Sequence, residues 1–155
     1  MKSILFICTG NIFRSMVAEY ALKALLGPEP GYAIGSAGIE AVPQRMHALI
    51  RDRLLEKGVD PSGHVQRKLT QDLLDRTHVP VAMGLDHREY IRRQFNRDVL
   101  LFNEICFQKP EPILDVHEAI PDWQANLHAA RAYALSVIDH IWDAMPTFLA
   151  RLPHV

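Results

Sequence analysis

A cysteine, an arginine and a serine stand close together near the start of the chain, in the run Cys8-Thr9-Gly10-Asn11-Ile12-Phe13-Arg14-Ser15. The apolar stretch Ile4–Ile7 precedes this run and predicts a buried strand, and a helical pattern begins at Ser15. The run therefore forms a loop between the carboxyl end of a strand and the amino end of a helix. Unpaired backbone N–H groups and the positive end of the helix dipole bind anions at such a place. The sequence predicts a phosphate-binding loop over residues 8–15.

Two side chains give this loop its chemistry. A guanidinium is a planar fork of donors that binds two phosphate oxygens at once, so Arg14 is expected to hold the anion. A helix N-terminus and a nearby cation can lower the pKa of a cysteine from about 8.5 to roughly 3.5–7.5, which makes the thiolate its resting form at neutral pH. A Cys8 thiolate inside an anion site is a nucleophile directed at phosphorus.

Two simpler interpretations of the loop fit less well. In the first, Cys8 is a buried structural thiol and Arg14 a surface charge, but Gly10 and Asn11 would then interrupt the apolar pattern for no reason. In the second, the run is a nucleotide-binding phosphate loop. That loop needs a glycine followed by Lys and then Ser or Thr in this register, and the chain has neither.

The loop resembles the N-terminal signature of the low-molecular-weight protein tyrosine phosphatases, Cys-x-Gly-Asn-x-Cys-Arg-Ser. The chain matches it at Cys8, Gly10, Asn11, Arg14 and Ser15. The resemblance continues in order through Ser36-Ala37-Gly38, His64 with residues 66–70, Ala82-Met83 and Pro121-Asp122. It covers nearly the whole chain and implies an enzyme that hydrolyses phosphotyrosine in proteins through a phosphocysteine intermediate.

The resemblance also implies a role for each residue of the site. Cys8 is the nucleophile, and Arg14 binds the phosphate together with the rest of the loop, which is Thr9, Gly10, Asn11, Ile12, Phe13 and Ser15. Asn11 is expected in a left-handed backbone conformation, with its amide held by Ser36 and His64. Ser15 is expected to donate a hydrogen bond to the thiolate.

Cleavage of a phosphate monoester also needs an acid that protonates the leaving oxygen and then activates water. Asp122 is the predicted general acid, because family members carry an Asp-Pro pair in a loop before the last helix. Here the proline precedes the aspartate and Trp123 follows it. Asp115 is the second candidate, and the plain alternative is that Asp122 only caps a turn. His117 is interpreted as a loop residue, since a thiolate stabilised by the loop needs no base.

Three departures from the family pattern bear on regulation and substrate. Phe13 stands where many members have a second cysteine, so a protective disulfide with the nucleophile is not expected. Ile39 and Val42 stand where many members place an aromatic wall for the substrate ring. Met83-Gly84 replaces a Met-Asp pair, so a carboxylate that supports the loop is either missing or supplied by Asp86.

Two other functions stay open. Arsenate reductases share the anion loop but need a relay of further cysteines, and this chain offers only Cys106, interpreted as a buried thiol at a strand end. A non-catalytic phosphate-binding module is the other alternative, if Asp122 does not reach the site.

Composition favours one enzyme domain over residues 1–155. A chain of 155 residues with 48% hydrophobic residues can bury roughly 70% of its unfolded surface without disulfides or metals. The net charge of −1 does not favour nucleic acid or an acidic membrane as partner. The expected partners are a phosphotyrosine-containing protein and inorganic phosphate or other oxyanions. No run reaches ~18 apolar residues, and two cysteines make no disulfide framework, so a cytoplasmic protein is expected. No metal or cofactor is expected.

The order of elements predicts the α/β class. Strands are expected at Lys2–Ile7, Ala33–Ala37, Val79–Met83 and Val99–Phe102. Helices are expected at Ser15–Leu26, Met46–Lys57, Gln71–Arg76, Asp86–Phe95, and from Asn126 to about Ala144, where Pro146 ends the last one. Residues 27–31 and 109–112 are interpreted as loops. The prediction is a single-domain three-layer sandwich with a central four-stranded parallel sheet flanked by helices, in which ligands bind at the carboxyl ends of the strands.

Overall fold

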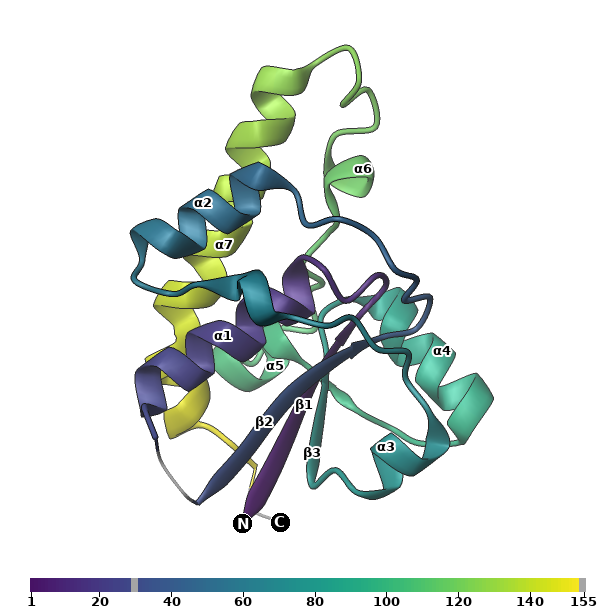
Figure 1. The fold of residues 1–155 in the computed structure, drawn as a ribbon. Coiled ribbons are helices and arrows are strands. Elements are labelled where there is room, and N and C mark those ends of the chain that lie inside the picture. Colours follow the sequence, from purple (N-terminus) through teal and green to yellow (C-terminus); the bar gives the residue numbers. More distant parts are fainter. Residues whose placement is uncertain (29–30, 154–155) are drawn as a thin grey trace.

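Four short parallel strands form the centre of the molecule in the part of the chain that the structure describes (Figure 1). The structure is a computed structural model and describes residues 1–28 and 31–153. The strands are β1 (Lys2–Cys8), β2 (Tyr32–Gly38), β3 (Val79–Ala82) and β4 (Leu100–Leu101), in the spatial order β2-β1-β3-β4. All three neighbouring pairs are parallel, so the carboxyl ends of the strands meet at one edge of the sheet.

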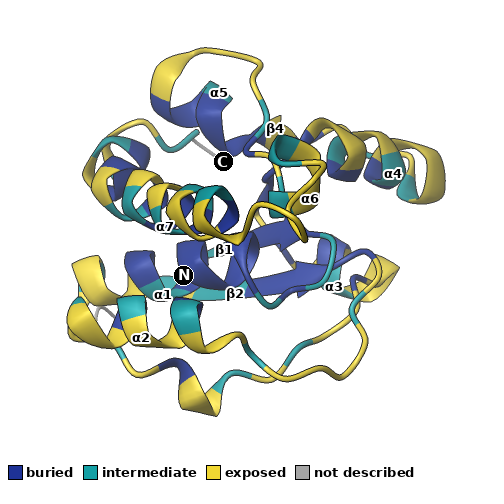
Figure 2. Cartoon of the chain, turned by 90° about the horizontal axis from the view of Figure 1, so that it is seen from above, coloured by how far each residue is buried: buried dark blue, intermediate teal, exposed yellow. Residues whose placement is uncertain are grey.

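Helices cover both faces of this sheet. They are α1 (Arg14–Leu26), α2 (Ala48–Glu56), α3 (Gln71–Asp75), α4 (Leu85–Phe95), α5 (Phe102–Phe107), α6 (Val116–Ala119) and α7 (Leu127–Ala150), with a 3-10 turn, η1, at Pro61–Gly63. Figure 2 views the molecule from above, roughly along the strands. It shows α1, α5 and α7 on one side of the sheet and α3 and α4 on the other, and α2 lies on the outer surface of the first side, where it contacts α7. The predicted three-layer α/β sandwich is confirmed.

The alternation of side chains along β1 divides the core in two. Ile4 and Phe6 face one core with α1, α5 and α7, and Leu5 and Ile7 face a smaller core with α3 and α4. Because β1 is central and buried on both sides, its sequence is a continuous apolar run without polar alternation. The same strand ends at Cys8, so a strand that is buried from Ile4 onward carries the predicted nucleophile to the edge of the sheet.

The last helix is longer than the sequence predicted. The expected end at Pro146 is wrong, because α7 continues to Ala150 with Pro146 inside it. Proline removes one backbone hydrogen bond from a helix and costs about 3 kcal/mol there. Phe148 offsets this cost, since it is fully buried and its ring lies 5.3 Å from Phe6 and 5.4 Å from Phe102.

A second correction concerns the region around the last strand. The predicted strand Val99–Phe102 shortens to Leu100–Leu101, and α5 begins at Phe102. Cys106 therefore lies in a helix and not at a strand end, although it is buried as expected. The predicted loop at residues 27–31 includes residues 29–30, which lie outside the described residues. No helix among the described residues has the length and apolar character needed to cross a membrane.

Candidate active site

Residues 9–13 connect β1 to α1 and form a tight loop around the end of the sheet (Figure 1). Asn11 has a φ of 55° and is fully buried. This left-handed conformation strains most side chains, and asparagine is one of the few that tolerate it. The backbone conformation at Asn11 is the one that the sequence led us to expect.

The carbonyl groups of this loop bind donors outside it. Ile39 N–H donates to Cys8 O and Glu40 N–H to Thr9 O, both at 2.9 Å. Two side chains from the segment after η1 continue this pattern, with Gln66 Nε2 donating to Gly10 O at 2.7 Å and His64 Nε2 to Asn11 O at 2.6 Å. Backbone N–H groups of residues 10–13 donate to no group among the described residues. A loop with its carbonyls bound on the outside keeps its N–H groups for an anion.

Gly38, at the end of β2, allows the strand to pass close to this loop. A Cβ atom at Gly38 would lie 2.5 Å from Thr9 O and 2.9 Å from Asn11 N, which is too close for any side chain. The contact between β2 and the loop is therefore backbone against backbone.

The Asn11 side chain sets the direction of the hydrogen bonds behind the loop. Its Oδ1 accepts from Arg67 N–H at 3.0 Å, which fixes the orientation of the amide. Its Nδ2 then donates both hydrogens, to Ser36 Oγ at 2.8 Å and to Ser15 Oγ at 3.0 Å. Ser36 in turn donates its hydroxyl hydrogen to Glu19 Oε1 at 2.5 Å.

This arrangement leaves one hydrogen for the sulfur. Ser15 Oγ accepts from Asn11, so its own hydrogen is free to donate to Cys8 Sγ, 2.9 Å away. A thiolate at Cys8 would accept this bond, and a hydrogen bond to an ionised acceptor is about twice as strong as one to a neutral acceptor. Ser15 thus places a hydrogen-bond donor beside the sulfur of Cys8.

Arg14 is buried, with only 2% of its side chain exposed, and is held from two sides. Its Nη1 donates to Ile113 O at 2.8 Å, and its Nη2 lies 3.4 Å from Thr9 Oγ1. Two carboxylates face the same guanidinium, since Asp115 Oδ2 lies 3.5 Å from Nη2 and Glu118 Oε1 lies 3.7 Å from Nη1. The guanidinium is fixed in place before any phosphate arrives.

The two candidate acids occupy different places. Asp115 caps α6, where its Oδ1 accepts from Val116 N–H at 2.7 Å, and it lines the same pocket as Cys8 and Arg14. Asp122 is exposed in the turn before α7 and does not line this pocket. The fold brings Asp115, and not Asp122, next to the phosphate loop. A sequence signal for this position was available, because Asp115 followed by Glu118 has the spacing of a helix capping box.

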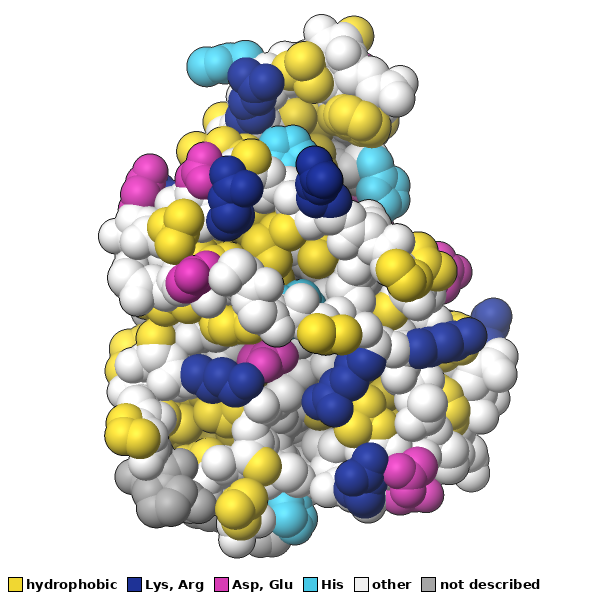
Figure 3. Space-filling view, in the orientation of Figure 1, with side chains coloured by type: hydrophobic (Ala, Val, Ile, Leu, Met, Phe, Trp, Pro, Cys, Tyr) yellow, Lys and Arg dark blue, Asp and Glu magenta, His cyan; other side chains and the backbone are white. Residues whose placement is uncertain are grey.

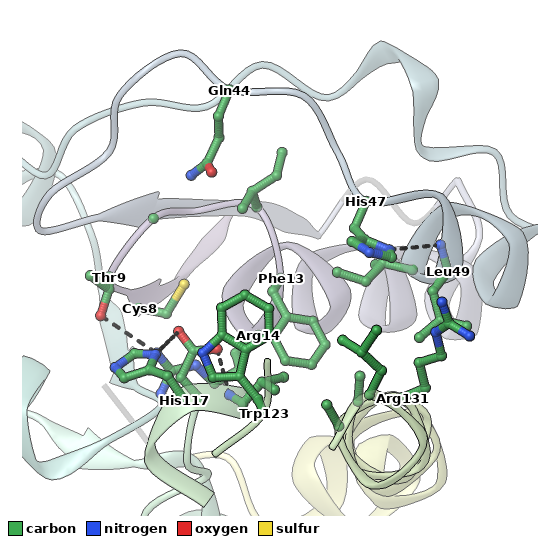
Figure 4. A pocket seen from close by; sticks show the side chains of 18 of the residues that line it. Cys8, Thr9, Phe13, Arg14, Gln44, His47, Leu49, His117, Trp123 and Arg131 are labelled. Carbon is green, nitrogen blue, oxygen red and sulfur yellow. Dashed lines mark hydrogen bonds and ion pairs between the residues drawn. The ribbon is translucent and has the colours of Figure 1, made fainter. Parts of the chain in front are cut away.

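The pocket over Cys8 has a volume of about 580 Å³. Figure 4 shows Cys8 at one end, Trp123 and His117 on one side, and Leu49 and Arg131 at the far end between α2 and α7. Apolar side chains from several elements make up most of the wall: Ile12, Phe13, Leu49, Ile50, Val116, Trp123, Leu127, Ala130 and Ala134. Phe13 and Trp123 are the aromatic residues of this wall, whereas Ile39 is buried in the core and Val42 is exposed. His117 also lines the pocket, with its Nδ1 3.7 Å from Asp115 Oδ2.

His87 is a site residue that the sequence did not reveal. It is fully buried, its Nδ1 accepts from Gly84 N–H at 3.0 Å, and its Nε2 lies 2.8 Å from Thr9 Oγ1. A Cβ atom at position 84 would lie 3.2 Å from the His87 ring and 2.8 Å from Asp86 Oδ1, so glycine makes room for the imidazole. Burial, and then the nearby charge of Arg14, lowers the pKa of His87 to about 4. The ring of His87 contacts Thr9 of the loop, and Asp86, the carboxylate that the sequence offered as a possible support, contacts this ring at 3.5 Å.

Cys106 stands apart from this site. It is fully buried in α5, and burial raises the pKa of its thiol to about 12. Among the described residues, no cluster of three or more His, Cys, Asp or Glu side chains is arranged to hold a metal ion.

Residues 3–152 match the family described as low molecular weight phosphotyrosine protein phosphatases. The chain belongs to this family. The low molecular weight protein-tyrosine-phosphatase Etp of Escherichia coli K12 is 37% identical over 115 residues, which are 72% of this chain and 76% of that protein. A protein-arginine-phosphatase of Bacillus subtilis is 35% identical over 98 residues, 61% of this chain and 63% of that protein. Arsenate reductase 2 of Staphylococcus epidermidis is 36% identical over 85 residues, 55% of this chain and 62% of that protein.

Two solved structures are similar to this chain over nearly its whole length. The tyrosine phosphatase Wzb from Escherichia coli K30, in complex with sulphate, has a TM-score of 0.77 at 26% identity and covers 98% of this chain and 99% of its own. A mutant of YwlE from Bacillus subtilis has a TM-score of 0.81 at 25% identity, with 98% and 99% covered. The predicted family and its cysteine-dependent phosphatase class are confirmed.

Proposed function

We propose that this protein hydrolyses phosphotyrosine in proteins through a phosphocysteine formed on Cys8, with Arg14 and the loop N–H groups holding the phosphate. One observation carries the proposal most directly. The Cys8 sulfur lies 2.9 Å from the hydroxyl oxygen of Ser15, at the floor of a loop whose N–H groups at residues 10–13 donate to no described group. A thiolate placed in an anion site serves as a nucleophile toward a phosphoryl group.

In the first chemical step, Cys8 Sγ attacks phosphorus. A bond between sulfur and phosphorus forms as the bond between phosphorus and the tyrosine oxygen breaks, and Asp115 transfers its proton to the departing oxygen. The charge on the three other phosphate oxygens is stabilised by Arg14 and by the N–H groups of residues 10–13. The contact of 3.5 Å between Asp115 and Arg14 supports this role, because it places the carboxyl group beside the bound phosphate.

In the second step, Asp115 acts as a base. Its carboxylate takes a proton from water, the water oxygen attacks phosphorus, and the bond between sulfur and phosphorus breaks. Inorganic phosphate leaves, Asp115 is protonated again and Cys8 returns as a thiolate. Ser15 stabilises the departing sulfur through the same hydrogen bond that prepared it for attack. We therefore assign the acid to Asp115 in place of Asp122.

The pocket wall favours an aromatic phosphoester over phosphoarginine. Ile12, Phe13 and Trp123 offer apolar contact to a phenyl ring, whereas a guanidinium would lose hydration against them. The carboxylate of Asp115, which also lines the pocket, already lies 3.5 Å from Arg14. Arg131 at the far end adds positive charge, which disfavours a cationic substrate group. Because one relative is a protein-arginine-phosphatase, phosphoarginine is the most important alternative substrate to compare with phosphotyrosine.

Arsenate reduction and simple phosphate binding are less well supported. Reduction needs a relay of cysteines, and Cys106 is buried in α5 with a raised pKa. A module that only binds phosphate would not need an aspartate over the loop, where Asp115 lies. Because a thiolate nucleophile survives in a reducing compartment, we infer that the protein works in the cytoplasm.

The deciding experiment compares phosphotyrosine peptide and phosphoarginine peptide as substrates of the wild-type protein and of Cys8→Ser. We expect phosphate release from the phosphotyrosine peptide alone, and none by Cys8→Ser. Rapid acid quenching followed by mass spectrometry should find the phosphoryl group on the peptide that contains Cys8. Faster release from phosphoarginine, or hydrolysis that survives in Cys8→Ser, would reject the proposal.

A further inference from the structure

A second, smaller cavity of about 320 Å³ opens beside the catalytic pocket. The two cavities share Ile12 and Gln44 in their walls. A substrate chain that leaves the catalytic pocket on this side therefore passes directly into the second cavity. Here this cavity is called the Arg45 recess, after the residue that gives it most of its charge.

The Arg45 recess is positively charged. Arg45 and Arg51 line it together with the ring of His64, and no Asp or Glu lies in its wall. Arg45 is exposed and makes no ion pair with any described residue, whereas Arg51 is paired with Asp52 at 3.1 Å. In the space-filling view, Lys and Arg side chains lie on the face formed by α2 and the loop before it, with Asp and Glu side chains beside them over α2 (Figure 3). This local charge contrasts with the net charge of −1 for the whole chain.

The recess is fixed relative to the phosphate loop. Gln66 Oε1 accepts from Gln44 N–H at 3.0 Å, and Gln66 Nε2 donates to Gly10 O at 2.7 Å. One side chain therefore ties the segment before α2 to the loop that carries Cys8. An anion bound in the recess has a defined position relative to the phosphate over Cys8, and this is what recognition of a flanking residue requires.

We propose that the Arg45 recess binds an acidic side chain of the substrate, close in sequence to the phosphotyrosine. This inference rests on the proposed function and adds a substrate preference to it. An extended peptide advances about 3.3 Å per residue, so residues within a few positions of the phosphotyrosine reach a cavity that shares a wall with the catalytic pocket. The apolar floor of Ile12 and Met46 suits the methylene groups of a glutamate, and Arg45 suits its carboxylate.

The test uses two phosphotyrosine peptides that differ only in having Glu or Gln at the three positions on each side of the phosphotyrosine. We expect the wild-type protein to hydrolyse the Glu peptide with a kcat/KM about fivefold higher at low salt, the range for a surface ion pair. Salt at 1 M should remove the preference, since the screening length falls to about 3 Å. Arg45→Gln should reduce the preference and Arg45→Glu should reverse it.

Arg92→Glu is the matched control, because Arg92 is exposed on α4, on the opposite side of the sheet, and makes no ion pair with a described residue. It changes the net charge by the same amount and should keep the full preference for the Glu peptide. Equal kcat/KM values for the two peptides in the wild-type protein would overturn the inference, and so would a preference that Arg45→Glu leaves intact. Hydrolysis of p-nitrophenyl phosphate distinguishes a failure of the Arg45 recess from a failure of the proposed function. If it proceeds without a peptide preference, only the Arg45 recess is rejected, and if it is absent, the proposed function itself fails.

Discussion

The Nε2 atom of His87 lies 2.8 Å from the hydroxyl oxygen of Thr9, the residue that follows the nucleophile. Since His87 Nδ1 accepts a hydrogen from Gly84 N–H, the ring proton is on Nε2 and is donated to Thr9. Thr9 Oγ1 also lies 3.4 Å from Arg14 Nη2. A neutral imidazole in this place supports the loop without adding a second positive charge beside Arg14 or a negative charge that would compete with phosphate.

The buried imidazole makes the stability of the protein depend on pH. The pKa of His87 is lowered from 6.5 to about 4 in the folded state, so between these values the unfolded chain binds a proton that the folded chain does not. Stability is therefore lost as the pH falls from about 6.5 to about 4, by an amount on the order of 3 kcal/mol. Urea unfolding at pH 7 and at pH 4.5 should show this loss in the wild-type protein and a smaller one in His87→Asn. His128→Asn, at an exposed position of α7, is the control, and equal losses in all three proteins would contradict the assignment.

Arg14→Lys should reduce kcat by on the order of 10²–10³, the range for loss of a donor that stabilises transition-state charge. A lysine is a point charge and cannot donate to Ile113 O and to two phosphate oxygens in the geometry of the guanidinium. The measurement is steady-state hydrolysis of p-nitrophenyl phosphate, with circular dichroism to verify folding. Cys8→Ser should lose turnover but keep binding of inorganic phosphate in calorimetry, because the loop N–H groups and Arg14 remain. Near wild-type rates in either variant would remove the loop from the mechanism.

Asp115→Asn should slow turnover by on the order of 10²–10⁴, the usual effect of losing a general acid. Because a good leaving group needs less protonation, the deficit should be smaller for p-nitrophenyl phosphate than for phenyl phosphate. Asp122→Asn is the matched control and should stay within about twofold of the wild-type rate, since surface substitutions away from a site have small effects. A larger deficit in Asp122→Asn than in Asp115→Asn would return the role to the residue first predicted from the sequence.

Oxidation of Cys8 by peroxide should be only partly reversible. A thiolate passes through sulfenic acid to sulfinic and sulfonic acids unless a nearby thiol captures the first product as a disulfide. Phe13 supplies no thiol within the loop, and the Cys106 thiol is buried with its pKa raised to about 12. Reductant should therefore restore only part of the activity, and bound phosphate should protect it. A disulfide between Cys8 and Cys106 in the mass spectrum, with full recovery, would contradict this expectation and strengthen the arsenate-reductase alternative.

Features set by nearby residues could be predicted from the sequence. The phosphate loop depends on a strand, a turn and a helix that follow one another between Lys2 and Leu26, and the structure has this order. The parallel sheet followed from the alternation of strands and helices, since parallel strands need crossover connections. Asn11 could be placed in a left-handed conformation because few residue types tolerate it.

Features set by contacts between residues far apart in the sequence could not be predicted in this way. The choice between Asp115 and Asp122 depends on how the segment after α5 packs, through backbone bonds such as Ile113 N–H to Met83 O at 2.8 Å. His87 is far from Thr9 in sequence and has no motif of its own around it. Pro146 is a local signal to end a helix, and burial of Phe148 against two other rings outweighs it. In each case a tertiary contact decides what the local sequence leaves open.

The surroundings of Gly38 limit which residues this position can accept. A methyl group there would lie 2.5 Å from Thr9 O and 2.9 Å from Asn11 N, both backbone atoms that cannot swing aside. At Gly63 an added methyl group would meet nothing within 4 Å. A library randomised at both positions and selected for phosphatase activity would keep glycine at 38 and accept many residues at 63. A position that carries no functional group is thus restricted to glycine by the backbone packed against it.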